Sequence, residues 1–382
     1  MKKVLINGAG GFIGANLVEH FINAGYSVRE SDIAGANLER AKSLGAEIAY
    51  AALNDPEAID ASMKGIDVVI HSAAIFNLAV PRDEIIATNV NGTRYYCEAA
   101  LKHGVERFVL FSTVGVYGIP RCTNITEDDT KSPRNPYEES KWLSEQVGMK
   151  YHYERGLPLT ALRPTLVYGP GSRYGQAMYV TLFSALKCWG FDNLPIPAGG
   201  KVNHHVHVLD VCSAVQTLAE ASNLVHGQAF NVADEHPLTS ASAMECFCEL
   251  SGIKAELKPQ ALQFAMAPTL KHGQGLLKKH LLGTLNKRLE KTWPRLVERF
   301  NLEPAFQPTF DVGWLDYLWA DHSYSTEKLK SLGWNAQVPT FTEGLPETVE
   351  WYRAQRWLPS IEEMQTFATE TKQRNARQKL AS

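Results

Sequence analysis

The chain has 382 residues, 45% of them hydrophobic and 21% charged, and carries a formal net charge of −3. This composition predicts a globular protein of one large domain, or of a domain with a sizeable appendage, and gives no reason to expect a nucleic acid partner. Six cysteines without C-x-x-C spacing predict neither a zinc site nor disulfides and fit a reduced cytoplasm, and no apolar run reaches the ~18 residues of a spanning helix.

A glycine-rich turn follows the first predicted strand. The strand is the apolar run at residues 4–6, the turn contains Gly8, Gly11 and Gly14, and residues 12–22 carry apolar side chains at helical spacing. Strand, glycine turn and helix in this order are the context of a dinucleotide-binding motif. The glycines allow a tight turn, backbone approach to a pyrophosphate, and close packing of helix on sheet. An ordinary glycine-rich turn is the alternative.

The second predicted strand leads to Asp32, eighteen residues after Gly14. A carboxylate at this distance can accept hydrogen bonds from both ribose hydroxyls of an adenosine. Residues 33–35 offer no cation for a 2′-phosphate, so the sequence favours NAD over NADP. The alternative is that Asp32 caps the next helix.

Helices and strands continue to alternate along the next part of the chain. Predicted helices lie at 36–45, from 55 onward and at 85–103, and predicted strands at 46–51, 66–70 and 105–112. Such alternation predicts a parallel sheet that is covered by helices on both faces. We expect His71, which ends the fourth strand, to be a packed structural residue, and Asn89 to be a hydrogen-bonding residue within its helix.

Thr113, Tyr137 and Lys141 are the candidate catalytic residues. Thr113 lies at the C-terminal end of the fifth strand, the edge at which doubly wound sheets bind ligands. Tyr137 and Lys141 are four residues apart at the start of a helix, and hence on one face. A neighbouring ammonium and an oxidised nicotinamide would lower the pKa of the phenol from about 10, which makes the phenolate a usable base. The alternative is a solvated helix face.

The regular alternation ends after a sixth predicted strand at 159–164. Residues 172–205 are rich in glycine, proline and aromatic residues, as suits a substrate pocket. The predicted elements beyond them are a strand at 206–210, a helix at 211–222 capped by Asp210, and a strand at 228–232.

Three histidines in this part raise the alternative of a metal site. They are His204, His205 and His207. No acidic or cysteine partner shares their spacing, so we expect histidines of a loop and a strand end.

Residues 261–300 have the pattern of a basic amphipathic helix. Its eight cations, against only Glu290 and Glu298, are Lys271, Lys278, Lys279, Lys287, Arg288, Lys291, Arg295 and Arg299. Apolar residues recur every four positions from 277 to 293, and Pro294 is expected to end the helix. Such a helix can lie on a membrane surface. The alternative is that its leucines pack on the substrate region.

The ordered motifs of the chain resemble the extended short-chain dehydrogenase/reductase superfamily over about residues 1–357. They are GAGGFIG at 8–14, Asp32, HSAA at 71–74, TNVNGT at 88–93, FSTVGVYG at 111–118, PYEESK at 136–141, LRPTLVYGPG at 162–171 and HVLDV at 207–211. The resemblance implies Tyr137 as catalytic base, Lys141 as its partner and as a ligand of the nicotinamide ribose, and Thr113 as catalytic hydroxyl. The cofactor-binding positions that we expect are Gly8, Gly11, Phe12, Ile13, Gly14, Asp32, Leu53, Ala73, Asn89, Tyr137, Lys141 and Pro164.

The C-terminal half is similar to the 3β-hydroxysteroid dehydrogenase branch, through its long insertion, WADHSYSTEKLKSLGW at 319–334 and FTEGLPETVEWYR at 341–353. We therefore expect NAD-dependent oxidation of a 3β-hydroxyl on a sterol or steroid-like lipid to a ketone, with 261–300 as a lid or a lipid contact. The first alternative is a nucleotide-sugar 4-epimerase or dehydratase, whose diphosphate Arg173 could bind. The second is a non-catalytic cofactor-binding protein.

The expected fold is α/β, a Rossmann-type doubly wound parallel sheet with a smaller C-terminal α/β substrate region. The expected divisions are an NAD-binding core at 1–170, a mainly substrate-binding region at 171–357 from which 206–232 returns to the core, and a polar, poorly ordered tail at 358–382. We expect a cytoplasmic enzyme, at most peripheral at a membrane, with an apolar small-molecule substrate and no metal. The resemblance also implies a homodimer through helices 85–103 and 137–154, with candidate interface residues Tyr95, Tyr96, Tyr151 and Tyr153.

Overall fold

The computed structural model describes residues 1–120, 122–259, 276–306, 308–310 and 320–381. The chain forms two compact units. The first comprises Met1–Val167, His205–Glu235 and Tyr324–Pro339, and the second comprises Tyr168–His204, His236–Ser323 and Thr340–Ser382.

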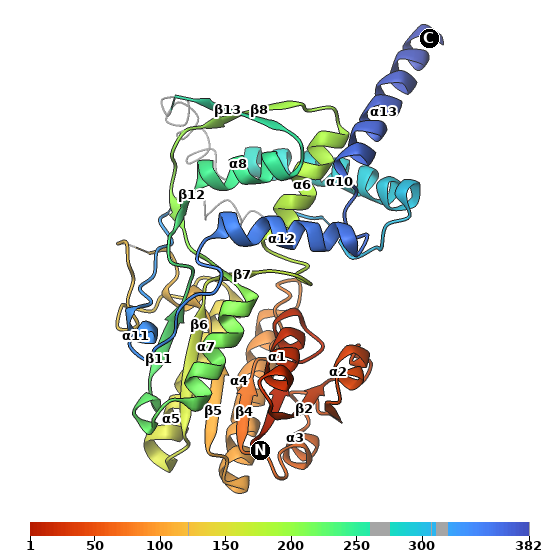
Figure 1. Ribbon diagram of the computed structural model, residues 1–382. Coiled ribbons are helices and arrows are strands. Elements are labelled where there is room, and N and C mark those ends of the chain that lie inside the picture. The colour runs from red at the N-terminus through yellow and green to blue at the C-terminus, as the bar shows by residue number, and fades with distance from the viewer. Residues whose placement is uncertain (121, 260–275, 307, 311–319, 382) are drawn as a thin grey trace. The chain divides into compact units, whose positions relative to one another are not determined.

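The first unit is built around a seven-stranded sheet in which all neighbouring strands are parallel (Figure 1). In spatial order its strands are β11 (Ala229–Val232), β6 (Leu159–Pro164), β5 (Arg107–Phe111), β4 (Val68–His71), β1 (Lys3–Asn7), β2 (Ser27–Asp32) and β3 (Glu47–Tyr50). The chain order reverses between β1 and β4, which is the switch point at which such sheets bind ligands. The predicted Rossmann-type fold is confirmed.

Helices cover both faces of the sheet. One face carries α1 (Phe12–Asn23), α2 (Glu39–Ser43) and α7 (Val208–Glu220), and the other carries α3 (Pro56–Ser62), α4 (Arg82–His103) and α5 (Pro136–Arg155). Successive residues of β1 alternate between two cores, with Val4 and Ile6 in the first and Leu5 in the second. All three are fully buried, as expected of a parallel sheet that is covered on both sides.

Shorter elements complete the first unit. They are the 3-10 helices η1 (Val114–Tyr117) and η2 (Asn223–Val225), the paired strands β7 (Leu166–Tyr168) and β10 (His205–His207), and α11 (Glu327–Lys330). The segment Tyr324–Pro339, which we placed in the substrate region from the sequence, belongs to this unit. Ser325 N donates to Ile125 O at 2.7 Å, and Lys328 Nζ donates to Ala229 O at 3.0 Å.

The second unit packs helices around a core of its own. Its helices are α6 (Gln176–Cys188), α8 (Ser240–Leu250), α10 (Leu276–Phe300), α12 (Phe341–Ala354) and α13 (Ile361–Ala381). Strand β8 (Asn193–Pro197) runs parallel to β13 (Lys254–Lys258), and β9 (Val202–Asn203) runs antiparallel to β12 (Leu238–Thr239). Aromatic side chains are prominent in the core, among them Phe183, Phe247, Phe306, Phe341 and Tyr352.

Helix α7 begins earlier than predicted, so the expectation that Asp210 caps it is wrong. His207 is the N-cap, and its Nδ1 accepts a hydrogen bond from Leu209 N at 3.4 Å. Asp210 is buried in the first turn, where its carboxylate accepts hydrogen bonds from the backbone of Gln337 and Val338. These partners lie more than a hundred residues away in the sequence, so local spacing cannot reveal them.

Helix α10 covers the second part of the predicted basic helix, whose residues 261–275 lie outside the described residues. Pro294 lies inside α10, so the expectation that it ends the helix is wrong. Leu289, Trp293 and Leu296 are buried on both sides of it in the core of the second unit. Their burial outweighs the hydrogen bond that proline cannot donate. In this part of the helix the apolar face is packed within the unit.

The C-terminal segment is helical, so the expectation of a poorly ordered tail is wrong. Ser360 and Glu363 cap α13 reciprocally: Glu363 N donates to Ser360 Oγ at 3.1 Å, and Ser360 N donates to Glu363 Oε2 at 2.8 Å. This capping box was visible in the sequence as S-x-x-E. Met364 then anchors the helix, because it is fully buried in the core of the second unit.

Candidate active site

The glycine turn connects β1 to α1 and packs against the residues that follow β4, at the switch point of the sheet. A Cβ added to Gly14 would lie 2.2 Å from Gly8 O, so only glycine lets α1 start this close to the turn. Gly8 has a φ of +74°, and a Cβ there would lie 2.8 Å from Ala73 Cα at the end of β4. Gly11 is the N-cap of α1, which leaves the helix N-terminus open toward a phosphate. Phe12 and Ile13, in the first turn, are partly buried against the core.

Asp32 ends β2 beside the glycine turn. Its carboxylate accepts hydrogen bonds from Gly10 N at 2.8 Å and from Ile33 N at 2.7 Å. The interpretation of Asp32 as a helix cap is wrong, because Leu38 is the N-cap of α2. Near by in the sequence, Leu53 packs against α4, where a Cβ on Gly92 would lie 2.8 Å from the Leu53 Cβ.

Asn7, which the sequence analysis did not single out, fixes the end of β4. Its Oδ1 accepts hydrogen bonds from Ser72 N at 2.8 Å and Ala73 N at 3.0 Å. Its Nδ2 must therefore donate to His71 Nδ1, at 2.6 Å, which leaves the histidine proton on Nε2 facing Thr93 Oγ1 at 3.0 Å. Burial lowers the pKa of His71 to about 3, so this ring is a neutral structural residue, as we expected.

Asn89 is buried on α4 and links three segments. Its Oδ1 accepts a hydrogen bond from Ile75 N at 2.7 Å, and its Nδ2 donates to Ile75 O at 3.1 Å. The same amide nitrogen donates to Ser140 Oγ on α5. Ser140 in turn donates to Tyr137 O at 2.7 Å, so Asn89 supports the first turn of α5 rather than facing solvent.

The sequence around Tyr137 starts α5 sharply. Asn135 is the N-cap, with its side chain accepting from Glu138 N at 2.9 Å, and Pro136 occupies the first helical position. Glu138 reaches back and accepts from Arg134 N at 2.7 Å. Tyr137 thereby lies in the first turn, where the helix dipole favours negative charge and hence a phenolate.

Thr113 lies between β5 and η1, and its Oγ1 accepts a hydrogen bond from Gly115 N at 3.1 Å. Among the residues that the structure describes, this hydroxyl donates no hydrogen bond, so its hydrogen is available to a substrate oxygen. Gly115 brings this turn against α5, because a Cβ there would lie 2.8 Å from Glu138 Cγ. The residue next to Tyr137 is therefore packed directly against the turn that Thr113 caps.

Lys141 is buried one helical turn after Tyr137. Burial lowers the pKa of its ammonium to about 8, opposed by the charge of Glu145. Within the part of the chain that the structure describes, this ammonium donates no hydrogen bond. A buried cation without an acceptor is costly, so the hydroxyls of a nicotinamide ribose would fit this position.

Two further hydroxyl groups line the same edge of the sheet. Ser112 follows β5, and Thr165 follows Pro164, the buried last residue of β6. Among the described residues, the hydroxyl oxygens of Ser112 and Thr165 are buried without a hydrogen-bond partner. Together with the glycine turn and the Lys141 ammonium, they show that the residues present fit a bound dinucleotide.

No group of three or more His, Cys, Asp or Glu residues within the described ranges is arranged to hold a metal ion. His205 and His207 are the first and last residues of strand β10, and His204 precedes it. None of the helices among the described residues is both long and apolar enough to cross a membrane.

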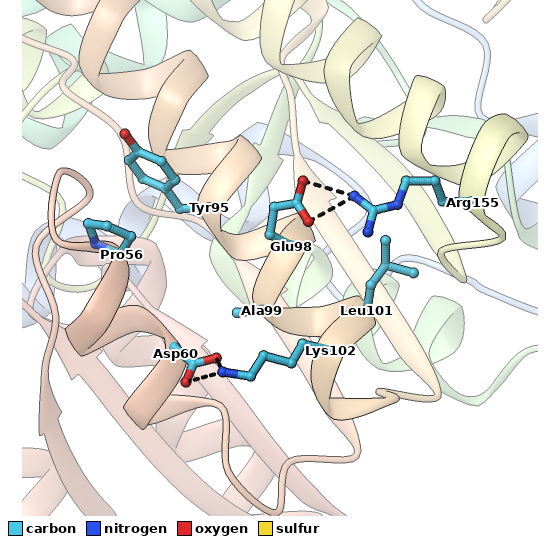
Figure 2. A pocket seen from close by; sticks show the side chains of 8 residues that line it. All are labelled: Pro56, Asp60, Tyr95, Glu98, Ala99, Leu101, Lys102 and Arg155. Carbon is cyan, nitrogen blue, oxygen red and sulfur yellow. Dashed lines mark hydrogen bonds and ion pairs between the residues drawn. The ribbon is translucent and has the colours of Figure 1, made fainter.

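The outer surfaces of α3, α4 and α5 carry a pocket of about 310 Å³ (Figure 2). Its charged groups neutralise one another, because Arg155 donates to both Glu98 oxygens at 2.8 Å and Lys102 donates to Asp60 at 2.8 Å. Its remaining lining residues are Pro56, Tyr95, Ala99 and Leu101.

The predicted interface tyrosines on α4 and α5 differ in exposure. Tyr96 is fully buried and stacks on His71 with ring centroids 4.8 Å apart, so the expectation that it lies at an interface is wrong. Tyr151 donates to Glu98, and Tyr153 is 73% exposed. Tyr95 lines the pocket of Figure 2. Pairing of two chains stays a prediction.

Comparison with known proteins agrees with this geometry. The family model described as "NAD dependent epimerase/dehydratase family" matches residues 4–233. The "3 beta-hydroxysteroid dehydrogenase/Delta 5-->4-isomerase" of Mycobacterium tuberculosis is 28% identical over 369 residues, which cover 92% of this chain and 90% of that protein. The "Sterol demethylase protein B" of Methylococcus capsulatus is 30% identical over 313 residues, which cover 78% of this chain and 85% of that protein. The solved structure of a UDP-glucose 4-epimerase from Thermotoga maritima superposes with a TM-score of 0.67 at 24% identity, covering 92% of this chain and 99% of that one.

Proposed function

The chain belongs to the NAD dependent epimerase/dehydratase family, so that NAD is its cofactor, and we propose that it oxidises the 3β-hydroxyl of a sterol or steroid-like lipid to a ketone. Two relatives that extend into the second unit carry the names of sterol enzymes. The observation that carries the choice of substrate is an exposed apolar surface beside Tyr137.

This surface is formed by the loop between β4 and α4. The Phe76 ring meets the Tyr137 ring edge to face, with centroids 4.8 Å apart. Phe76 and Leu78 are each 53% exposed. Single exposed apolar side chains are common on protein surfaces, but two of them on one loop beside a candidate catalytic residue form a patch that can bind an apolar ligand. A steroid ring system would cover them, whereas a sugar would leave them in contact with hydroxyl groups.

Each candidate catalytic residue has a proposed task in the oxidation. Tyr137, in the first turn of α5 and one turn before the Lys141 ammonium, accepts the proton of the substrate hydroxyl as the phenolate. Thr113 donates its free hydroxyl hydrogen to the substrate oxygen. Bound NAD would accept the hydride from the same carbon. Lys141 and Asp32 would hold the two riboses of the cofactor.

The variant Tyr137→Phe tests this assignment. It removes one hydroxyl, so NADH binding should survive, whereas steroid turnover should fall by the roughly 10²–10⁴-fold typical of losing an acid/base group. Tyr153→Phe, on the exposed part of the same helix, is the control and should keep wild-type turnover. Wild-type turnover in Tyr137→Phe would rule out the role of Tyr137.

The apolar surface has its own test. Phe76→Ser should raise the KM for a 3β-hydroxysteroid by about tenfold, the effect of losing a 1–2 kcal/mol apolar contact, and leave NADH affinity unchanged. Leu224→Ser replaces another exposed apolar residue of the first unit, in η2, and should change neither quantity. An unchanged KM in Phe76→Ser would contradict an apolar substrate at this loop.

A nucleotide-sugar epimerase or dehydratase is the second candidate, and one residue favours it. Arg173 is exposed, and its guanidinium lies over the Trp357 ring, 5.0 Å from the centroid. Among the described residues it has no carboxylate partner, so it is available to a diphosphate. If the protein is a nucleotide-sugar enzyme, Arg173→Ala should abolish binding of UDP-glucose. If it is a steroid dehydrogenase, as we propose, Arg173→Ala should leave steroid turnover unchanged.

We propose that the enzyme works in the cytoplasm and makes two further contacts. The outer faces of α4 and α5 would pair two chains, and sedimentation at micromolar concentration checks this pairing.

The exposed Lys287, Lys291 and Arg295 follow one face of α10 at four-residue spacing. They would bring the enzyme to anionic lipid that holds its substrate, and co-sedimentation with anionic but not neutral vesicles is the expected result.

A further inference from the structure

A buried ion pair lies one helical turn beyond Lys141. Glu145, on α5, is 2% exposed at its side chain, and Arg163, on β6, is 4% exposed. Arg163 donates from Nη2 to Glu145 Oε1 and from Nε to Glu145 Oε2, the second at 3.1 Å. Its remaining Nη1 donates to Tyr117 OH at 2.7 Å and to Glu127 O at 3.0 Å. The pair is therefore bidentate, and each of the three guanidinium nitrogens donates a hydrogen bond.

Stability alone is a weak explanation for such a pair. The cost of removing two charges from water offsets much of their attraction, and apolar residues of similar volume often give an equally stable protein. What distinguishes this pair is its neighbour. The Glu145 carboxylate is the group whose charge raises the pKa of Lys141, against the lowering effect of burial.

The titratable groups around Lys141 come from three elements. Tyr137 and Glu145 lie one turn away in opposite directions on α5. His71 of β4 is neutral, because burial, aided by the charge of Lys141, lowers its pKa to about 3. Arg163 of β6 faces the far side of Glu145, and the carboxylate in turn raises the pKa of the guanidinium.

We propose that Glu145 and Arg163 are positioning residues for Lys141. Glu145 keeps the Lys141 ammonium protonated, and Arg163 keeps Glu145 ionised while it fixes α5 to the sheet. Neither residue touches the reacting atoms. This inference rests on the cofactor-binding role of Lys141 in the proposed function, but not on the identity of the substrate.

The test is the pH dependence of NADH affinity, followed by nucleotide fluorescence on the full chain. Affinity should fall as Lys141 loses its proton, from about pH 8 in the free wild-type protein. Glu145→Gln removes the favourable charge and should shift this fall to lower pH by about one unit, and Arg163→Met, which lets the buried and unpaired Glu145 carboxyl take up a proton, should shift it in the same direction. A merely structural role would leave the pH profile of NADH affinity in place in both variants.

Either single variant leaves a buried charge unpaired, which can prevent folding. The double variant Glu145→Gln/Arg163→Met removes both charges, so it tests the effect on Lys141 without leaving a buried charge unpaired. Because Glu145, and not Arg163, acts on Lys141 directly, the fall in NADH affinity of the double variant should still shift to lower pH. The exposed ion pair between Glu98 of α4 and Arg155 of α5 supplies the control, Glu98→Gln/Arg155→Met, whose profile should match the wild type.

Two outcomes would overturn the inference: a folded double variant with a wild-type profile, or a double variant that does not fold, since the pair would then serve stability. Lys141→Met separates this failure from failure of the proposed function. If Lys141→Met binds NADH with the wild-type affinity and pH profile, the cofactor role of Lys141 itself is wrong. Steroid turnover is not part of this readout, so the substrate assignment does not affect it.

Discussion

Asn89 Nδ2 donates a hydrogen bond to Ser140 Oγ at 2.9 Å and so joins α4 to the turn of α5 that lies between Tyr137 and Lys141. The contact is buried, and the same asparagine side chain forms two hydrogen bonds with the backbone of Ile75 in the loop after β4. A single amide therefore connects the loop that carries the apolar surface with the helix that carries the proposed base.

Asn89→Ala should reduce both stability and activity. It leaves Ile75 N and Ser140 Oγ without their partner, which costs about 1–3 kcal/mol per buried unsatisfied group. Turnover should fall because the first turn of α5 loses its support. Asn91→Ala, two residues on at a less buried site, is the matched control, and denaturant unfolding is the measurement. Equal stability of the two variants would contradict the role of Asn89.

Gly14→Ala should abolish NAD binding. The new Cβ would lie 2.2 Å from Gly8 O and 2.6 Å from Ala9 Cα, and both are backbone atoms that cannot move aside cheaply. Gly283→Ala is the control, because no atom lies within 4 Å of a Cβ added there in α10. It should leave NADH affinity unchanged and stabilise the helix by about 0.5–1 kcal/mol. NADH titration of Gly14→Ala at wild-type affinity would show that the turn does not face the cofactor.

Asp32 should make the protein prefer NADH to NADPH. Its carboxylate beside the glycine turn can accept ribose hydroxyls but repels a 2′-phosphate, and residues 33–35 supply no compensating cation. Asp32→Asn should narrow the ratio of the two affinities by about tenfold, whereas Asp83→Asn, at a fully exposed carboxylate, should not. Tighter binding of NADPH by the wild type would overturn the assignment of Asp32.

Glu30 should make stability depend on pH. Burial, aided by the charge of Asp32, raises the pKa of the Glu30 carboxyl from 4.5 to about 7. The folded protein then retains a proton that the unfolded chain releases above pH 4.5, so this group destabilises the fold as pH rises toward 7 and fully so above it. Glu30→Gln should raise the thermal midpoint at pH 8 and leave it unchanged at pH 4. The same gain at both pH values would contradict this explanation.

The parallel sheet and the helices that cover it could be predicted because apolar runs, turn glycines and helix starts are local signals. Tyr137 and Lys141 were selected as candidates in the same way, since their four-residue spacing on a helix is visible in the sequence. The capping box at Ser360 was equally visible, and the helix after it was missed only because its composition is polar.

Partners that are distant in the sequence could not be predicted. Asp210 accepts hydrogen bonds from residues 337–338, and Glu145 is paired with Arg163 on another element. Tyr96 has the spacing of an exposed aromatic, but the fold buries it on His71. The identity of such residues suits several environments, and only the three-dimensional arrangement selects one.

The most direct test of the proposed function is a comparison of substrates on the purified protein with NAD. A set of 3β-hydroxysteroids and a set of UDP- and dTDP-sugars would be followed both by NADH formation and by product analysis, because an epimerase gives no net NADH. We predict stoichiometric NADH and a 3-ketosteroid from the first set, and no conversion of the second. Conversion of a sugar nucleotide together with no turnover of any 3β-hydroxysteroid would contradict the account.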